Sequence, residues 1–304
     1  MPIQKKEKRL LHEKDTEIIK QQNYWIVKHN DLITHSRYTL TLSQHRLLLF
    51  LISKIKPNDI IDDEYRANIK DIINICEYYK NSGTYYKQIK DDLLALRNSA
   101  IWIETERGLE TMGWLSKARF TNPKKGTKDY QEVIFKFDEG LDTYLFDLQK
   151  FYTQYNLEDI LLLSHKYSLR LYEYLMSYAN LMYAIIPIEE LKIRIDAESY
   201  SRFDNFERRI LKPAIEDISA HTKITVVYDK LRKQGSAYTH IAFYIWGVNE
   251  DSKDMTLDDM RIIAGTMANI QRRINRQRKR IIDKEKAIKT SGEVTAQTSM
   301  FDRD

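Results

Sequence analysis

The chain has 304 residues, of which 42% are hydrophobic and 31% charged, and its formal net charge is +5. This length suits two domains of ordinary size. So small a net charge does not by itself indicate binding to nucleic acid, and the informative feature is that the positive charges are clustered along the chain. The single cysteine excludes a disulfide within the chain, and we expect a cytoplasmic protein without a signal peptide or a membrane span.

The first half of the chain predicts a charged arm followed by one folded domain. Residues 1–22 are charged and weakly patterned, which is typical of a mobile arm. From 23 to 150, apolar residues recur at helical or alternating spacing. These patterns predict a strand at 24–33, helices at 44–54, 69–78 and 85–98, a hairpin from 101–105 and 111–116, and a strand at 132–137. Thr41 or Ser43 is expected to cap the first of these helices.

The second half repeats the order of helices followed by a hairpin. Residues 151–248 predict helices at 163–176, 188–195 and 201–218, then strands at 223–228 and 239–245. A helix, a turn, a basic helix and a hairpin with a basic tip are the elements of a winged helix-turn-helix. The predicted fold class is therefore α+β: tandem winged helix-turn-helix domains, helix-rich, with small antiparallel β-hairpin wings. Residues 249–304 predict a basic helical extension and a disordered tail, whose role stays open.

The organising stretch is the predicted helix at 201–218. Apolar residues three or four apart form one stripe, namely Phe203, Phe206, Ile210, Ala214 and Ile218. Arginine reads guanine and asparagine reads adenine in the major groove, so the candidate base-reading residues are Arg202, Asn205, Arg208 and Arg209. In the hairpin tip, Lys230, Arg232 and Lys233 are expected over phosphates or in the minor groove. The alternative is a solvated helix face and an ordinary turn. Pro213 predicts a kink, or a helix whose DNA-reading half lies before the proline.

No enzyme chemistry emerges from the motifs. The seven histidines include no His-apolar-His pair that would hold a divalent metal beside a nucleophilic tyrosine. The chain contains no phosphate-binding Gly-x-x-x-x-Gly-Lys-Ser/Thr loop, and one cysteine with scattered histidines does not make a zinc site. The acidic cluster at 62–64 has no third ligand nearby and indicates a solvated turn. We therefore expect a protein that is not an enzyme and has no cofactor or metal.

A family resemblance comes from five stretches: 164–175, 206–218, 222–228, 240–245 and, more loosely, 42–49. These stretches resemble the theta-type plasmid replication initiators that bind iterons, the Rep proteins with two winged-helix domains. The run Leu-Lys-Pro-Ala at 211–214 looks like the family's pattern, which accounts for Pro213. The resemblance covers about 23–247.

The resemblance implies a function that spacing does not show. It implies binding of directly repeated duplex sites at a plasmid origin, local melting, and recruitment of the host initiator and the replicative helicase. It also implies a monomer on the repeats and a homodimer that represses its own promoter. By the same likeness Lys212 joins the contacts of the second domain, and the first domain's backbone contacts are Lys87, Lys90 and Arg97. Two alternatives are a winged-helix transcriptional regulator without a replication role and a metal-dependent nicking enzyme.

Overall fold

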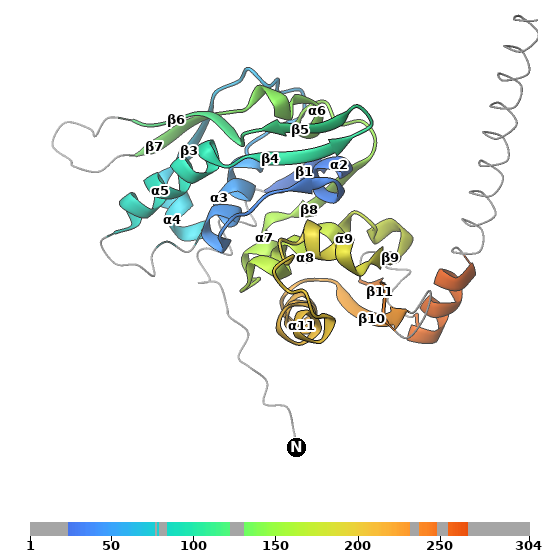
Figure 1. Ribbon diagram of the computed structural model, residues 1–304. Coiled ribbons are helices and arrows are strands. Elements are labelled where there is room, and N and C mark those ends of the chain that lie inside the picture. Colours follow the sequence, from blue (N-terminus) through green and yellow to red (C-terminus); the bar gives the residue numbers. More distant parts are fainter. Residues whose placement is uncertain are drawn as a thin grey trace, which may run out of the picture. The chain divides into compact units, whose positions relative to one another are not determined.

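A computed structural model describes residues 24–76, 78, 84–121, 131–231, 237–247 and 255–266 (Figure 1). The chain divides into two compact units, 1–253 and 254–304. Of the second unit, residues 255–266 are described. Residues 257–266 form a helix. Thr256 caps its start, because the Oγ1 of Thr256 accepts a hydrogen bond of 3.2 Å from the backbone N–H of Asp259. The predicted arm at 1–22 and most of the predicted basic extension lie outside the described residues.

The first half of the larger unit mixes helices with strands of three sheets. Its helical elements are α2 (Asn30–Thr34), α3 (Leu42–Ile52), α4 (Ile69–Ile75), α5 (Tyr85–Asn98), the 3₁₀ turn η2 (Glu139–Leu141) and α6 (Asp142–Leu145). Its strands are β1 (Trp25–His29), β2 (Ser36–Arg37), β3 (Tyr65–Asn68), β4 (Ile101–Thr105), β5 (Gly108–Met112), β6 (Leu115–Phe120) and β7 (Glu132–Phe137). Of the two predicted cap residues, Thr41 is the one that caps α3, through a capping box with Gln44.

The second half is built from similar helices and strands. Its helical elements are α7 (Leu157–Leu161), α8 (Lys166–Met176), the 3₁₀ turn η3 (Ala179–Leu181), α9 (Ile188–Arg194), α10 (Phe203–Phe206), the π-helical turn η4 (Glu207–Leu211) and α11 (Lys212–His221). Its strands are β8 (Tyr152–Asn156), β9 (Tyr183–Pro187), β10 (Thr225–Leu231) and β11 (His240–Trp246). The predicted helices and the β10–β11 hairpin are confirmed, and β9 is a strand that the sequence did not reveal.

The two halves repeat one topology. In each, a strand and a short helix precede a longer helix, then come a strand, a short helix, a long helix and a hairpin. The first half has in addition the sheet β2-β4-β5, of which β4 and β5 stand between its long helix and the β6–β7 hairpin. The antiparallel sheets have matching orders, β3-β7-β6 and β9-β11-β10, so the hairpin's second strand always lies in the centre. This is the tandem winged-helix fold of class α+β that the sequence predicts. The opening strands of the two halves, β1 and β8, pair with each other in antiparallel register.

The equivalence of β1 and β8 bears on the predicted domains at 23–150 and 151–248. Because β8 opens the second copy of the repeat, the repeat supports a division just before it. The strand order also means that each half contributes one strand to the two-stranded sheet between them. The division remains a prediction.

The prediction of a hairpin from 101–105 and 111–116 was wrong in its second strand. β4 pairs with β5, which begins at Gly108, whereas Leu115 already belongs to β6 and pairs with β7. The alternating pattern is interrupted because Trp114 is fully buried, with its ring 4.8 Å from that of Tyr38. The wing of the first half is therefore β6–β7. Its connecting loop, including the basic residues 124–128, lies outside the described residues. The predicted strand at 24–33 is also too long, because its second half forms α2.

A buried ionic cluster joins four elements of the two halves. Glu173 of α8 pairs with Lys28 of β1 and lies 3.1 Å from Nε2 of His45 of α3, and it also accepts a hydrogen bond from the hydroxyl of Tyr155 of β8. All four side chains are almost completely shielded from solvent. Arg46, the neighbour of His45, donates to the backbone carbonyls of 161 and 163 at 2.9 and 2.8 Å. The resembling stretches 42–49 and 164–175 therefore supply the joint between the halves.

Candidate nucleic-acid interface

The predicted helix at 201–218 is helical throughout, but it changes its winding in the middle. In η4 the backbone N–H of Lys212 bonds to the carbonyl of Glu207, five residues earlier. Directly after this wide turn stands Pro213, which has no N–H and whose ring would crowd the carbonyl four residues before it in a regular helix. The wide turn gives the proline room. Where the sequence predicted a kink, the structure has a π-helical turn followed by a regular helix.

The wide turn also shifts the buried stripe along the helix. Phe206 and Ile210 are buried before the shift, as predicted, and Phe203 is partly buried. After it, the predicted Ala214 and Ile218 are buried as well, and Leu211 and Ile215, each one position after a predicted stripe residue, join them. The sequence pattern missed Leu211 and Ile215 because it assumed one constant helical period. The core that anchors this helix is therefore wider than predicted.

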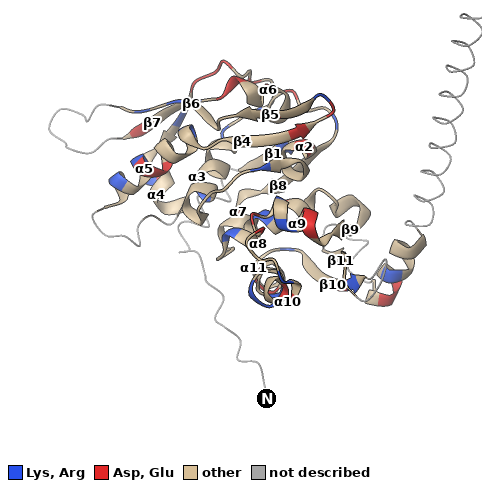
Figure 2. Cartoon of the chain, in the orientation of Figure 1, with Lys and Arg blue, Asp and Glu red and all other residues tan. Residues whose placement is uncertain are grey.

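The opposite side of the same helix carries exposed cations (Figure 2). Arg202 lies 3.6 Å from Asp204, and both side chains are more than 70% exposed, so this pair holds the guanidinium weakly. Arg208 donates a hydrogen bond of 3.3 Å to Oδ1 of Asn205. Arg209 and Lys212 are exposed and make no hydrogen bond or ion pair with another described residue. Four predicted cations thus share one solvent-facing surface, with Asn205 partly exposed among them.

The wing of the second half lies beside this helix. β10 packs against α11 and pairs with β11 from Thr225 opposite Trp246 to Leu231 opposite His240. Lys230 is close to the α10–η4–α11 helix, called the recognition helix below, because its ammonium lies 3.1 Å from Oε1 of Glu207. Lys230 lies inside β10 rather than in the hairpin tip where it was predicted. The other two predicted tip residues, Arg232 and Lys233, lie outside the described residues. That Lys230 contacts a phosphate stays a prediction. In such a contact the phosphate and Glu207 would have to share the ammonium of Lys230.

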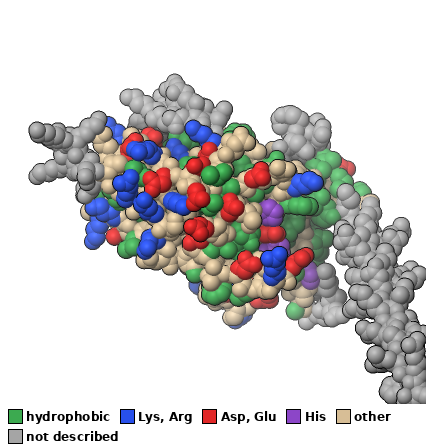
Figure 3. Space-filling view, turned by 90° about the horizontal axis from the view of Figure 1, so that it is seen from above, with side chains coloured by type: hydrophobic (Ala, Val, Ile, Leu, Met, Phe, Trp, Pro, Cys, Tyr) green, Lys and Arg blue, Asp and Glu red, His purple; other side chains and the backbone are tan. Residues whose placement is uncertain are grey.

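In the first half, α5 takes the place in the repeat that α11 takes in the second. Its predicted contacts Lys87, Lys90 and Arg97 are all exposed. The ammonium of Lys90 lies 5.5 Å from the ring centroid of Phe120, at the end of β6. The exposed Arg119 on β6, which packs against α5, belongs to the same region, although the sequence did not single it out. Figure 3, which views the molecule from above, shows basic side chains gathered toward one end of the visible face, with acidic ones among them.

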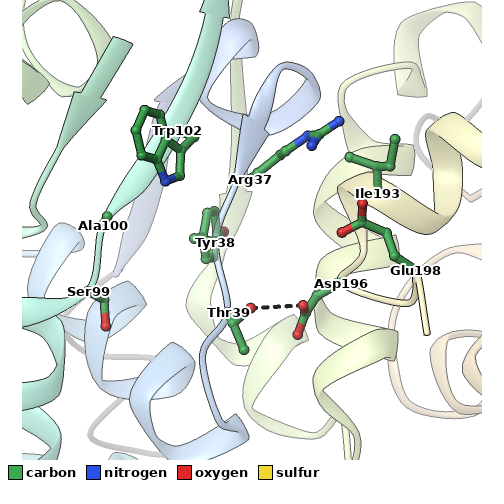
Figure 4. A pocket seen from close by; sticks show the side chains of 9 residues that line it. All are labelled: Arg37, Tyr38, Thr39, Ser99, Ala100, Trp102, Ile193, Asp196 and Glu198. Atoms are coloured by element: carbon green, nitrogen blue, oxygen red, sulfur yellow. Dashed lines mark hydrogen bonds between the residues drawn. The ribbon is translucent and has the colours of Figure 1, made fainter. Parts of the chain in front are cut away.

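A pocket of about 340 Å³ lies away from the predicted contacts, since none of them lines it (Figure 4). One wall carries Trp102 and Arg37, and the other carries Asp196 and Glu198. Thr39 donates a hydrogen bond of 2.9 Å to Asp196, which also pairs with Lys166 at 2.6 Å. The carboxylate of Asp196 is therefore satisfied by the protein itself.

Over the described stretches of the chain, no three His, Cys, Asp or Glu side chains gather closely enough to hold a metal ion. The acidic turn at 62–64 instead pairs with lysines: Asp62 with Lys136 and Glu64 with Lys117, both at 2.6 Å. Among the helices whose residues are described, none combines the length and the apolar character needed to cross a membrane.

Two models of known protein families match the chain. The model described as "Initiator Replication protein, WH1" matches residues 25–176, and the model described as "Initiator Rep protein, WH2" matches 187–245. The chain belongs to the Rep family of replication initiators. The two matches follow the two winged-helix repeats in order, although the first extends past β8 to the end of α8.

Two relatives of this Rep-family chain are informative. A "Replication initiation protein" of Escherichia coli is 26% identical over an alignment of 225 residues that covers 67% of this chain and 65% of the relative. The match thus spans just under two thirds of the relative's length. The crystal structure of the Pi initiator protein in complex with iteron DNA aligns with a TM-score of 0.59 and 21% identity, over 76% of this chain and 99% of that one. This second likeness supports the tandem winged-helix fold.

Proposed function

We propose that this chain is a plasmid replication initiator that binds directly repeated duplex sites at its origin. The observation that carries the proposal is the exposed cationic face of the α10–η4–α11 helix, set on a buried aromatic and aliphatic stripe next to a wing. An α-helix fits the major groove, where arginine and asparagine read base edges. Membership of the Rep family and the likeness to the Pi initiator, which was crystallised with iteron DNA, support the same function.

The residues divide by the contact that we propose for each. Arg209 is free of partners among the described residues, and we assign it to a base edge together with Arg202, Asn205 and Arg208. Lys212 and the wing cations Lys230, Arg232 and Lys233 are assigned to phosphates, which add affinity without sequence information. The first domain adds phosphate contacts from α5 through Lys87, Lys90 and Arg97.

Further parts of the proposal rest on family likeness. The initiator melts DNA beside the repeats and recruits the host initiator and the replicative helicase. It acts as a monomer on the repeats and as a homodimer when it represses its own promoter. It works in the cytoplasm. It catalyses no reaction of its own, because its role is to bind DNA and to bring other proteins to it.

The test is a pair of measurements on the full chain. Fluorescence anisotropy compares a labelled duplex carrying the repeats that flank the gene with a scrambled duplex of equal composition and length. We expect a preference of about 1,000-fold or more for the repeats at physiological salt. In cells, the gene with its flanking DNA should sustain a plasmid that lacks another origin. Equal affinity for both duplexes would refute the proposal, whereas a clear preference without plasmid maintenance would favour a transcriptional regulator.

A further inference from the structure

The side of the recognition helix next to the wing carries an acid where cations would be expected. Glu207 is the first residue of η4 and directly precedes Arg208 and Arg209. Its carboxylate accepts a hydrogen bond of 2.8 Å from the hydroxyl of Tyr228 and pairs with the ammonium of Lys230 at 3.1 Å. Both partners belong to β10, the first strand of the wing. One carboxylate on the helix therefore binds two side chains of the wing.

The surroundings hold this bridge in place. The side chain of Glu207 is 21% exposed and that of Lys230 34%, so the pair is partly shielded from water. The ammonium of Lys230 also lies 5.0 Å from the ring centroid of Tyr238 and 5.9 Å from that of Phe203. These two rings contact each other with centroids 5.7 Å apart. The ammonium of Lys230 thus lies near two aromatic rings as well as the carboxylate, and cation–π attraction adds to the ion pair.

The charge of Glu207 would be a disadvantage if the residue served only to bind DNA. A carboxylate beside the phosphates is repelled by them, and the same residue also neutralises the one described cation that we assign to the wing. A gain in another term must offset this loss. The gain that fits the contacts is order: a fixed wing angle means that helix and wing reach their DNA contacts without a further loss of conformational freedom.

We propose that Glu207 is a positioning residue, which fixes the wing against the recognition helix and thereby gives preference to the correct DNA sequence over DNA in general. The inference rests on the proposed DNA-binding function. It assigns to Glu207 no contact with a base. With the bridge in place, the wing contacts a duplex that suits the helix without further ordering. A duplex that does not suit the helix lacks this gain, while the carboxylate still repels its phosphates and Lys230 is already paired.

The experiment compares Glu207→Gln with Glu216→Gln in the full chain. Glu216 is exposed on the same helix and makes no hydrogen bond or ion pair with another described residue, so both variants remove one negative charge from one helix. Affinity for the repeat duplex and for scrambled DNA is measured by anisotropy. For Glu216→Gln we expect a rise for both duplexes. For Glu207→Gln we expect scrambled DNA to bind more tightly and the repeats about 10-fold more weakly, as for loss of a charge-assisted hydrogen bond.

A second variant excludes a simple effect of charge or of misfolding. Tyr228→Phe removes one of the two bonds to Glu207 without changing any charge, so affinity for the repeats should fall by about 3-fold while that for scrambled DNA stays the same. The melting temperature identifies any variant that fails to fold. If Glu207→Gln tightens binding to both duplexes as Glu216→Gln does, or if Tyr228→Phe leaves the preference unchanged, the positioning role is wrong.

A readout without DNA separates this inference from the proposed function. In the free protein, amide hydrogen exchange of β10 should be faster in Glu207→Gln than in the wild type, while exchange in the equivalent strand β6 of the first half should not change. If the wild type shows no preference for the repeats, the proposed function fails, and the exchange data still report whether Glu207 holds the wing. Unchanged exchange in β10 would overturn the bridge itself.

Discussion

Glu173 and His45 lie 3.1 Å apart although they are 128 positions apart in the chain, and this contact belongs to the joint between the two winged-helix repeats. Glu173 also pairs with the fully buried Lys28. Removing the negative charge would leave that ammonium without compensation in a site that water does not reach. We therefore expect Glu173→Gln to lower the free energy of unfolding by roughly 3–5 kcal/mol, measured by urea denaturation.

The matched control for this change is Glu132→Gln. Glu132 also forms an ion pair, with Arg66 at 3.2 Å, but the two side chains are 37% and 65% exposed. Solvent screens such a pair, so the expected loss is at most about 1 kcal/mol. Losses of similar size in the two variants would show that the buried cluster adds no special stability to the joint.

The same cluster makes stability depend on pH. Burial lowers the pKa of His45 from 6.5 to about 4, against the opposing effect of Glu173. Between these values the unfolded chain binds a proton that the folded protein does not, so stability is complete above about pH 6.5 and falls as the pH drops toward 4. The loss is on the order of 3 kcal/mol.

Urea denaturation at several pH values checks this window. In His45→Gln the decline between pH 6.5 and 4 should become shallower, because the titrating imidazole is gone. Glu173 titrates in a lower window: although burial alone would raise its pKa, Lys28 and His45 hold that pKa well below its usual range. An identical pH profile in His45→Gln and wild type would contradict the assignment.

The end of the second wing depends on a glycine. Gly247 follows β11 with φ of +81°, and a Cβ at this position would lie 2.4 Å from the backbone carbonyl oxygen of Lys223. Gly247→Ala should therefore destabilise the protein by more than the roughly 1–3 kcal/mol that a strained backbone alone costs. Gly108→Ala is the control, since φ is +133° there but nothing lies within 4 Å of the added Cβ. Thermal unfolding of both variants separates strain from collision, and equal losses would argue against the collision.

Local periodicity was enough to predict most helices and the repeat of elements. α5 and β7 have the predicted bounds, and α9 ends one residue earlier than predicted. These elements are regular and amphipathic, so each residue's burial follows from the spacing of its neighbours. The order of these elements indicated the winged-helix fold, and the family likeness then supplied the expected function.

What the sequence did not reveal depends on long-range or irregular structure. The burial of Trp114 against Tyr38 ended one strand and began another, which alternation within a segment does not indicate. The wide turn before Pro213 moved Leu211 and Ile215 into the core. The sequence analysis did not single out Glu207, because its partners Tyr228 and Lys230 are more than 20 residues away.

The cationic face of the recognition helix gives the prediction on which the proposed function depends most. Arg209 is exposed and unpaired among the described residues, so its guanidinium is available to the two acceptors of a guanine. We expect Arg209→Ala to cost about 1–3 kcal/mol of affinity for the repeats, and to relax selectivity at one base position only. Competition with repeats that carry each single-base change would locate that position.

Two controls separate reading from mere charge. Lys212→Ala removes a neighbouring cation that we assign to phosphate, so it should weaken all duplexes alike and reduce the slope of log affinity against log salt by about 0.9. Arg107→Ala removes an exposed arginine between β4 and β5, away from the recognition helix in the chain, and should change neither affinity nor selectivity. If Arg209→Ala behaved like Lys212→Ala, with a uniform loss across all sequences, Arg209 would be a phosphate contact. The reading of bases would then have to lie with Arg202, Asn205 or Arg208.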